Sequence, residues 1–117
     1  MADANAVHTP CESNQHLQAA DSPPLDKRDP NVVRDYQQAV GSCMFLTVFT
    51  RGDCALAKNQ RAWFMANPGP THITAIRRVL RYLARTLHMG ITYQRTDANT
   101  ANQLYATADA DHAGADD

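Results

Sequence analysis

Acidic and imidazole side chains that could bind a metal ion gather near the C-terminal end of the sequence. They are Asp109, Asp111, His112, Asp116 and Asp117. Magnesium prefers carboxylate ligands, but a two-metal nuclease site needs further carboxylates from other elements. No further set follows Asp117 in the sequence. The spacing alone therefore favours an acidic tail in solvent over a formed metal site.

Four arginines lie close together in the middle of the sequence. They are Arg77, Arg78, Arg81 and Arg85. Three of them recur every fourth residue, which places them on one stripe of a helix, with Arg78 beside it. No acidic residue lies between Asp53 and Asp97 to relieve their repulsion. Two interpretations stay open: such a stripe is most often solvated surface, but it could also contact phosphates or the acidic parts of this chain.

The distribution of charge supports a basic module between acidic ends. Residues 36–96 carry Arg and Lys against a single acid, Asp53, whereas residues 97–117 carry only acids and residues 1–35 carry more acids than bases. The overall net charge of −1 conceals this asymmetry. A basic middle region is typical of a surface that attracts a polyanion.

Other kinds of chemistry find little support in the sequence. Cys11, Cys43 and Cys54 are too widely spaced for a zinc motif, and we expect Cys43 and Cys54 to be buried free thiols. No histidine is spaced for a nucleophile pair, and there is no glycine-rich phosphate loop. No signal peptide or membrane span is evident, so we expect an intracellular protein, cytoplasmic or nuclear, that is not secreted and has no membrane partner.

Three helices are expected to position the arginines. The first begins near Asn31 and runs through Val48, with Gly41 allowing a close helix crossing. Thr50 and Asp53 have the spacing of a capping box that would start the second helix. Lys58 and Arg61 are expected to face outward. The expected apolar face carries Ala55, Leu56, Asn59, Trp63 and Ala66.

The third helix is the most strongly patterned stretch of the sequence. Apolar residues recur at alternating spacings of three and four: Ile73, Ile76, Leu80, Leu83 and Leu87. The break at residues 67–70 delivers the chain into this helix, and Gly90 is expected to cap its end. Ile91–Tyr93 and Gln103–Thr107 are strand candidates around a polar turn.

The predicted fold class is mainly α: a small three-helix module followed by a short β-hairpin, with a disordered N-terminal lead. Residues 1–31 form the extended or disordered lead, with no helix longer than a turn. Residues 32–89 form the helical module, and residues 90–117 contain the hairpin. A module of this size buries a modest core, so its stability is expected to be marginal.

Several ordered blocks together resemble a known family. They are Tyr36–Leu46, Thr50–Asp53, Phe64–His72, Arg77–Leu83, Gly90–Tyr93 and Asp109–Asp111 with Ala113 and Gly114. Their order and spacing are similar to the Pol polyprotein of copia-type long-terminal-repeat retrotransposons. The similar region covers about residues 7–117 and corresponds to the C-terminal part of reverse transcriptase, through thumb and connection, into the start of ribonuclease H.

The resemblance has implications for the site residues. Asp109 matches the family's first ribonuclease H carboxylate, a remnant that would be the one metal ligand here, while the Tyr-x-Asp-Asp polymerase motif does not occur. The resemblance thus implies a fragment of a larger α+β polymerase that is not an enzyme as it stands. It needs no cofactor alone, whereas the intact parent uses Mg²⁺. The missing palm or ribonuclease H parts of the polyprotein are its implied partners.

Three functions remain open at this stage. The first is a catalytically inactive polyprotein product, and the second is a module that binds an RNA or DNA duplex without sequence preference through Arg77, Arg78, Arg81 and Arg85. The third is a helical interaction module that uses the Ile73–Leu87 apolar seam on a partner.

Overall fold

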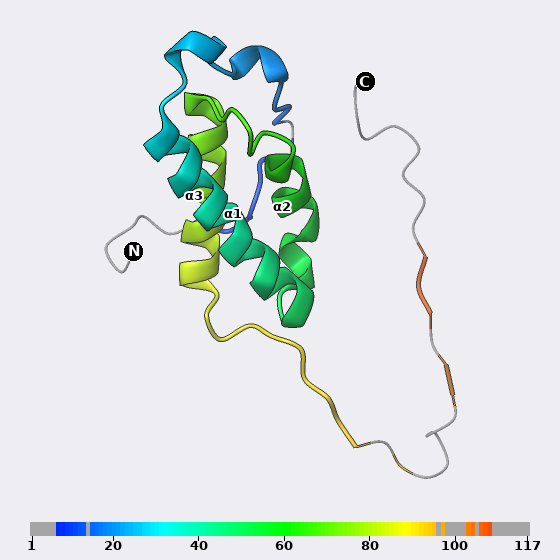
Figure 1. The fold of residues 1–117 in the computed structure, drawn as a ribbon. Helices are drawn as coiled ribbons and strands as arrows, with labels where there is room; N and C mark the ends of the chain where they lie inside the picture. The colour runs from blue at the N-terminus through cyan, green and yellow to red at the C-terminus, as the bar shows by residue number, and fades with distance from the viewer. Residues whose placement is uncertain (1–6, 14, 96, 98–102, 105, 109–117) are drawn as a thin grey trace.

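The structure is a computed structural model that describes residues 7–13, 15–95, 97, 103–104 and 106–108. In this part of the chain the α-helices are α1 (Pro30–Phe49), α2 (Ala55–Ala62) and α3 (Pro70–Arg85). Short 3₁₀ turns lie at Ala19–Asp21, Leu25–Lys27 and Gly52–Cys54. The three helices pack against one another pairwise, and the N-terminal segment passes alongside them (Figure 1). The mainly helical class predicted from the sequence is confirmed.

α1 begins where the sequence predicts, for a local reason. The Asp29 carboxylate accepts a hydrogen bond of 2.8 Å from the backbone N–H of Asn31, and Pro30 occupies the first helical position. The face turned to the core carries Val33, Tyr36, Val40 and Cys43. Gly41 lies on the opposite, exposed face with nothing within 4 Å of where a Cβ would stand. The predicted close helix crossing at Gly41 is therefore wrong.

The connection between α1 and α2 differs from the predicted capping box. Thr50 ends α1 instead of starting α2: its N–H donates to the Leu46 carbonyl at 2.9 Å, and its hydroxyl donates to the same oxygen at 3.5 Å. Asp53 is not free to cap a helix, because Arg51 and Tyr82 both bind its carboxylate. The chain instead passes through the Gly52–Cys54 turn into α2.

α2 buries a different face from the predicted one. Leu56 and Trp63 are 64% and 71% exposed, whereas Ala57 and Arg61 are each only 1% exposed. The small Ala57 side chain fits against the core, and Arg61 finds polar partners inside the fold, beginning with the Ala57 carbonyl at 2.8 Å. A hydrophobicity pattern does not count such internal hydrogen bonds, so it placed Arg61 outward.

α3 follows its predicted amphipathic pattern but ends earlier than predicted. Ile76 and Leu83 are buried, together with Val79 between them. The helix stops at Arg85, and Gly90 does not take the left-handed conformation of a C-terminal cap. The carbonyl of Thr86 accepts a hydrogen bond from Arg51 at 2.8 Å, which satisfies a helix-end acceptor from outside the helix.

One hydrophobic core lies between the three helices. Its buried members are Tyr36, Val40, Cys43, Cys54, Ala57, Ile76, Val79, Tyr82 and Leu83. Cys43 and Cys54 are free and buried, as predicted, and burial raises the pKa of the Cys54 thiol to about 11. Such a thiol is uncharged near neutral pH and is unsuited to nucleophilic chemistry.

The N-terminal lead is not disordered over the residues that the structure describes. It contains no helix longer than a single 3₁₀ turn there, as predicted, yet Val7 and Cys11 pack against the core. The Asn67 amide donates to the Pro23 carbonyl at 2.7 Å, and His72 bonds to the Gln18 carbonyl at 3.0 Å. These long-range contacts hold a polar segment whose composition suggested disorder.

The predicted β-hairpin is not supported. The described residues beyond α3, which are 86–95, 97, 103–104 and 106–108, contain no strand, and the segment 91–95 trails away from the helices (Figure 1). Residues 98–101 of the predicted turn and Tyr105 of the second predicted strand lie outside the described residues. Two isolated strands without a third element or a core to cover them are at best marginally stable. Among the described helices, none has the length and apolar character to cross a bilayer.

Candidate nucleic-acid interface

The arginines of α3 lie on the side of the helix away from the core. Arg77 and Arg85 are exposed, while Arg78 and Arg81 are partly buried. The apolar stripe turned inward fixes this orientation, since residues three and four apart share one face. The helix therefore presents guanidinium groups over about two turns without an acidic residue among them.

Only part of this positive charge is compensated within the described part of the chain. Arg78 donates to the Glu12 carboxylate at 2.9 Å and to the Thr9 hydroxyl at 3.0 Å. The side chains of Arg77, Arg81 and Arg85 form no hydrogen bond or ion pair with the described residues. The Nε atoms of Arg78 and Arg81 are buried without a partner there. One acidic segment of the chain thus relieves the repulsion in part, as the sequence suggested it could.

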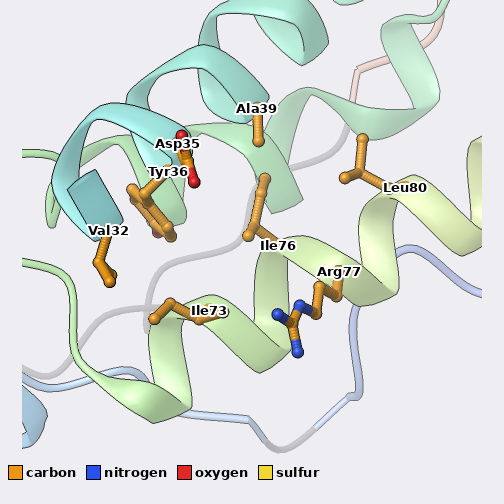
Figure 2. A pocket seen from close by; sticks show the side chains of 8 residues that line it. All are labelled: Val32, Asp35, Tyr36, Ala39, Ile73, Ile76, Arg77 and Leu80. Carbon is orange, nitrogen blue, oxygen red and sulfur yellow. The ribbon is translucent and has the colours of Figure 1, made fainter.

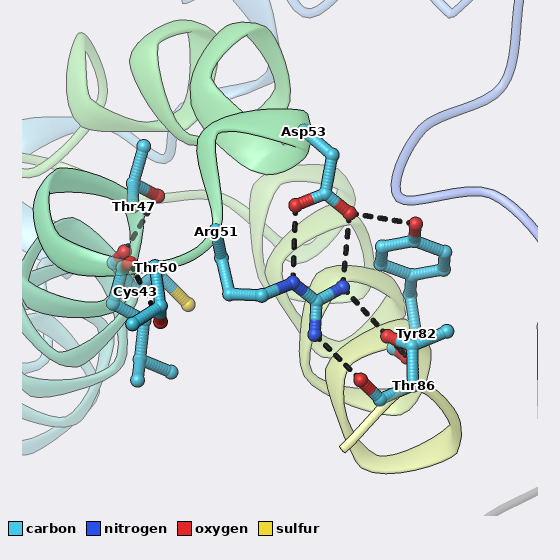
Figure 3. Close-up of polar contacts among 8 residues, drawn as sticks. Cys43, Thr47, Thr50, Arg51, Asp53, Tyr82 and Thr86 are labelled. Atoms are coloured by element: carbon cyan, nitrogen blue, oxygen red, sulfur yellow. Dashed lines mark hydrogen bonds and ion pairs between the residues drawn. The ribbon is translucent and has the colours of Figure 1, made fainter. Parts of the chain in front are cut away.

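A second arginine, Arg51, organises the lower end of the bundle. Its guanidinium binds both oxygens of Asp53 at 3.0 and 2.9 Å, and it donates to the carbonyl and hydroxyl of Thr86 at 2.8 and 2.7 Å (Figure 3). The Tyr82 hydroxyl donates to Asp53 at 2.7 Å, and the guanidinium carbon of Arg51 lies 5.4 Å from the centre of the Tyr82 ring. The network ties the α1–α2 connection to the end of α3, so it supports the helix that carries the exposed arginines.

The same network lowers the pKa of Asp53 and raises the pKa of Tyr82. The hydrogen bonds from Arg51 lower the pKa of Asp53 to about 2, and the contact with that carboxylate raises the pKa of Tyr82. Asp53 therefore stays ionised at any physiological pH. A buried guanidinium that is paired and hydrogen-bonded in this way is a structural element rather than a reactive one.

Arg61 is a third kind of arginine, fully buried and without a carboxylate in the described residues. Its guanidinium donates to the Ala57 carbonyl and, at 3.2 Å, to the side-chain oxygen of Gln15 from the lead. Burial lowers its pKa, and the positive charge of Arg78 lowers it further. Gln15 and Glu12, which bind Arg61 and Arg78, are joined by a hydrogen bond of 3.3 Å from the Gln15 N–H to the Glu12 carbonyl, so both arginines lie beneath the same turn of the lead.

A groove between α1 and α3 lies beside the exposed arginine Arg77. It has a volume of about 230 Å³, and its apolar floor includes Ile73, Ile76 and Leu80. Asp35 and Arg77 stand at its sides (Figure 2). These two side chains carry opposite charges, so the groove itself offers no concentrated positive potential, and phosphate contact belongs to the arginines of α3 beyond it.

His72 joins the start of α3 to the lead. Its Nδ1 accepts a hydrogen bond of 2.9 Å from the Gly69 N–H, so Nε2 carries the proton and donates to the Gln18 carbonyl. Its ring stacks on Phe64 with centroids 4.0 Å apart. Burial lowers the pKa of His72, which keeps the ring neutral and in this tautomer.

The predicted metal-binding residue cannot be placed. Asp109 and the acidic residues after it lie outside the described residues, so the structure says nothing about their arrangement. Within the described ranges, no three Cys, His, Asp or Glu side chains come together as a metal site would require. The candidate interface is built from the described residues of α3 and the lead.

Sequence patterns missed Arg51, Arg61 and His72 as organising residues. Arg51 and Asp53 were visible as neighbours of opposite charge two residues apart, which is the available signal for their pairing. Arg61 carries no such signal, because its partners Gln15 and Ala57 are a distant amide and a backbone carbonyl. For His72 the available signal is its position two residues after Pro70, the proline that starts α3, where a side chain can cap the helix.

The chain is similar to proteins of two descriptions. Over 79 residues, 68% of this chain, it is 46% identical to the Secreted RxLR effector protein 161 of Plasmopara viticola and spans 54% of that protein. Over 114 residues, 97% of this chain, it is 38% identical to the Retrovirus-related Pol polyprotein from transposon RE1 of Arabidopsis thaliana and spans 7% of it. The corresponding polyprotein from transposon TNT 1-94 of Nicotiana tabacum is 33% identical over 115 residues, 8% of its length.

No family model matches the chain, and no solved structure does. The curated relatives nevertheless agree with the resemblance seen in the ordered sequence blocks. The chain spans about half of the effector protein and less than a tenth of the Pol polyproteins. Because the similarity to the polyproteins extends along nearly its whole length, the chain corresponds to a short segment of the Pol polyproteins of copia-type retrotransposons.

Proposed function

We propose that this chain is a catalytically inactive Pol segment that binds the backbone of an RNA or DNA duplex without sequence preference. The observation that carries the proposal is the charge on α3: Arg77 and Arg85 are exposed and unpaired within the described residues. Guanidinium groups bind phosphate oxygens well and carry no base information there. The rigid attachment of α3 to the core fixes their spacing.

Binding of this kind has a characteristic dependence on salt. Each phosphate contact releases a condensed counterion, so the logarithm of the binding constant falls by ~0.9 per contact for each decade of salt concentration. Fluorescence anisotropy with a labelled duplex of arbitrary sequence measures this slope. Replacing Arg77 and Arg85 by glutamine should make the slope less steep by about 1.8 if each contacts one phosphate.

A matched control separates this surface from overall charge. Arg28 and Arg34 are exposed arginines outside α3, so the double change Arg28→Gln, Arg34→Gln alters net charge equally. That control should keep the wild-type salt slope. Equal losses in the two double variants would instead indicate attraction by net charge, and the assignment to α3 would be dropped.

The proposed lack of catalysis rests on sequence. The Tyr-x-Asp-Asp motif of the family's polymerase does not occur, and Asp109 is the one residue that matches the ribonuclease H carboxylates. One carboxylate cannot hold the two divalent ions of phosphodiester cleavage. We therefore expect no cofactor for the chain alone and reserve Mg²⁺ for the intact parent enzyme. Polymerase or ribonuclease H turnover by the purified chain with magnesium would overturn this part.

An intracellular location, in the cytoplasm or the nucleus, goes with this function. The relative from Plasmopara viticola is described as secreted, so the expectation needs a direct test. Export of a reporter fused behind residues 1–31 would contradict it.

A second candidate function is protein interaction through the Ile73–Leu87 seam. Ile73 and Leu80 are partly exposed at the groove beside α1, and Leu87 is 82% exposed, whereas Ile76 and Leu83 are occupied in the core. The missing polyprotein parts are the expected partners. Sedimentation of the chain mixed with a palm or ribonuclease H segment tests this: a heavier species supports it, and unchanged sedimentation of both counts against it.

A further inference from the structure

The N-terminal residues 7–13 and 15–18, which we term the strap, cover a cluster of arginines. Glu12 and Thr9 bind Arg78, and Gln15 binds Arg61. Val7 and Cys11 rest against the core between these polar contacts. The strap therefore lies over one site and not along scattered points of the surface.

The charge beneath the strap is poorly balanced. Arg61 is 1% exposed and binds only neutral oxygens, while Arg78 has Glu12 as its one acidic partner in the described part of the chain. Arg81, one helical turn beyond Arg78, has no acidic partner there. The Nε atoms of all three are buried and unpartnered within the described residues. Guanidinium groups so arranged favour an anion with several acceptor oxygens.

We propose that Arg61, Arg78 and Arg81 form a covered anion site that takes a phosphate group, with the Glu12 carboxylate occupying it when no phosphate is bound. The proposal rests on the function proposed above and deepens it, because it assigns a specific phosphate contact to the inner arginines. Arg77 and Arg85 then supply the outer contacts to the same backbone.

The pairing of Glu12 is weak enough to be exchanged. Its side chain is 62% exposed, and an exposed ion pair contributes little net stability because water competes for both charges. A phosphate group carries more oxygens and more charge than one carboxylate, so it can engage more of the cluster. Displacing Glu12 moves the strap and uncovers Cys11, which is partly buried in the strap's present position.

Cys11 provides a direct measurement of this exchange. Cys43 and Cys54 are each 1% exposed, so a thiol reagent at low concentration should label Cys11 first, as peptide mass spectrometry can verify. Pyrophosphate should accelerate labelling of Cys11 in a saturable way, while sodium chloride at the same ionic strength should not. Glu12→Gln should lower the half-saturating pyrophosphate concentration about two- to fivefold, the range expected for losing one exposed ion pair.

Asp26→Asn is the matched control, since Asp26 is an exposed acid of the lead outside the strap and the change alters net charge equally. It should leave the half-saturating concentration unchanged. The proposal is overturned if pyrophosphate and chloride act alike, or if the two variants shift the concentration equally.

A second arm replaces pyrophosphate by a short DNA duplex. Faster Cys11 labelling by the duplex at a lower phosphate concentration assigns the site to a nucleic-acid backbone, and acceleration by pyrophosphate alone assigns it to a free phosphate ligand. The two proposals can fail separately. If the chain binds no duplex, the pyrophosphate response of Cys11 labelling still tests the covered anion site. If pyrophosphate has no effect, the salt dependence of duplex binding still tests Arg77 and Arg85.

Discussion

At the residue scale, one residue type takes three different positions in this fold. Arg51 is buried and paired with Asp53, Arg61 is buried with neutral partners, and Arg77 is exposed. The difference comes from the hydrogen-bond acceptors that lie within reach of each guanidinium, not from the side chain itself. Arginine tolerates all three environments because it stays charged and offers five donors in a fixed plane.

The Arg51–Asp53 pair predicts how stability responds to acid. The pKa of Asp53 is depressed to about 2, so its contribution is present above the unfolded-state value near 4 and is lost as the pH falls toward 2. Because the Asp53 side chain is 35% exposed, solvent screening reduces the contribution to about 1 kcal/mol. Urea unfolding between about pH 5 and pH 2 should show this loss in the wild type and not in Asp53→Asn.

His72 predicts a second pH dependence with the same sign. Its pKa is lowered by burial, so the folded state holds it neutral and loses stability as the pH falls below the unfolded value of about 6.5. Protonation of Nδ1 would remove the acceptor for the Gly69 N–H. The nearby Asp21 charge opposes the shift without cancelling it.

His72→Gln should remove the pH dependence that His72 causes. It should also lower stability by about 1–3 kcal/mol near pH 8, because a buried hydrogen-bonded group is replaced by a poorer fit. Chemical unfolding at about pH 8 and pH 5 measures both effects. A wild type equally stable at the two values would contradict the account of His72.

At the element scale, the sequence predicted helix existence better than helix ends. The periodicity of α3 predicted the helix and two of its buried residues, Ile76 and Leu83, but Leu87 of the predicted seam lies beyond the helix and is 82% exposed. The end of α3 at Arg85 depends on Arg51, a residue of a distant turn that binds the Thr86 carbonyl. A local pattern contains no information about such a contact.

Substitution by alanine at two glycines is expected to change the stability of the fold in opposite directions. A Cβ on Gly69, at the start of α3, would overlap the backbone of Asp21, whereas Gly41 in α1 has open space around it. Gly69→Ala should therefore cost about 1–3 kcal/mol of stability through forced displacement of the lead. Gly41→Ala should add about 0.5–1 kcal/mol, since alanine favours a helix interior.

Thermal unfolding of the two glycine variants beside the wild type compares these effects directly. Each variant adds one methyl group, so any general effect of the substitution is shared. Equal changes in melting temperature would show that the lead does not press on Gly69 in solution.

At the scale of the whole molecule, the core is small and the lead completes it. Val7 and Cys11 pack against the buried cluster although they belong to a segment that composition assigned to disorder. The sequence could not reveal this, because isolated apolar residues in a polar stretch show no period. The same holds for the covered arginines: their partners in the strap are visible only once the chain is folded.

Removing the apolar contacts of the strap should destabilise the whole fold. Val7→Ser with Cys11→Ser should cost about 1–2 kcal/mol, the value for partly buried side chains of this size. Leu25→Ser is the matched control in the same lead, since Leu25 is 77% exposed and should change stability little. Equal losses by urea unfolding would contradict a specific role for the strap.

The salt dependence of duplex binding tests the central claim most directly. The account predicts measurable affinity for duplexes of unrelated sequence, a steep decline with added salt, and a shallower slope when Arg77 and Arg85 become glutamine but not when Arg28 and Arg34 do. A chain that fails to bind duplex even at low salt, or whose slope is unchanged by the α3 variant, would contradict it.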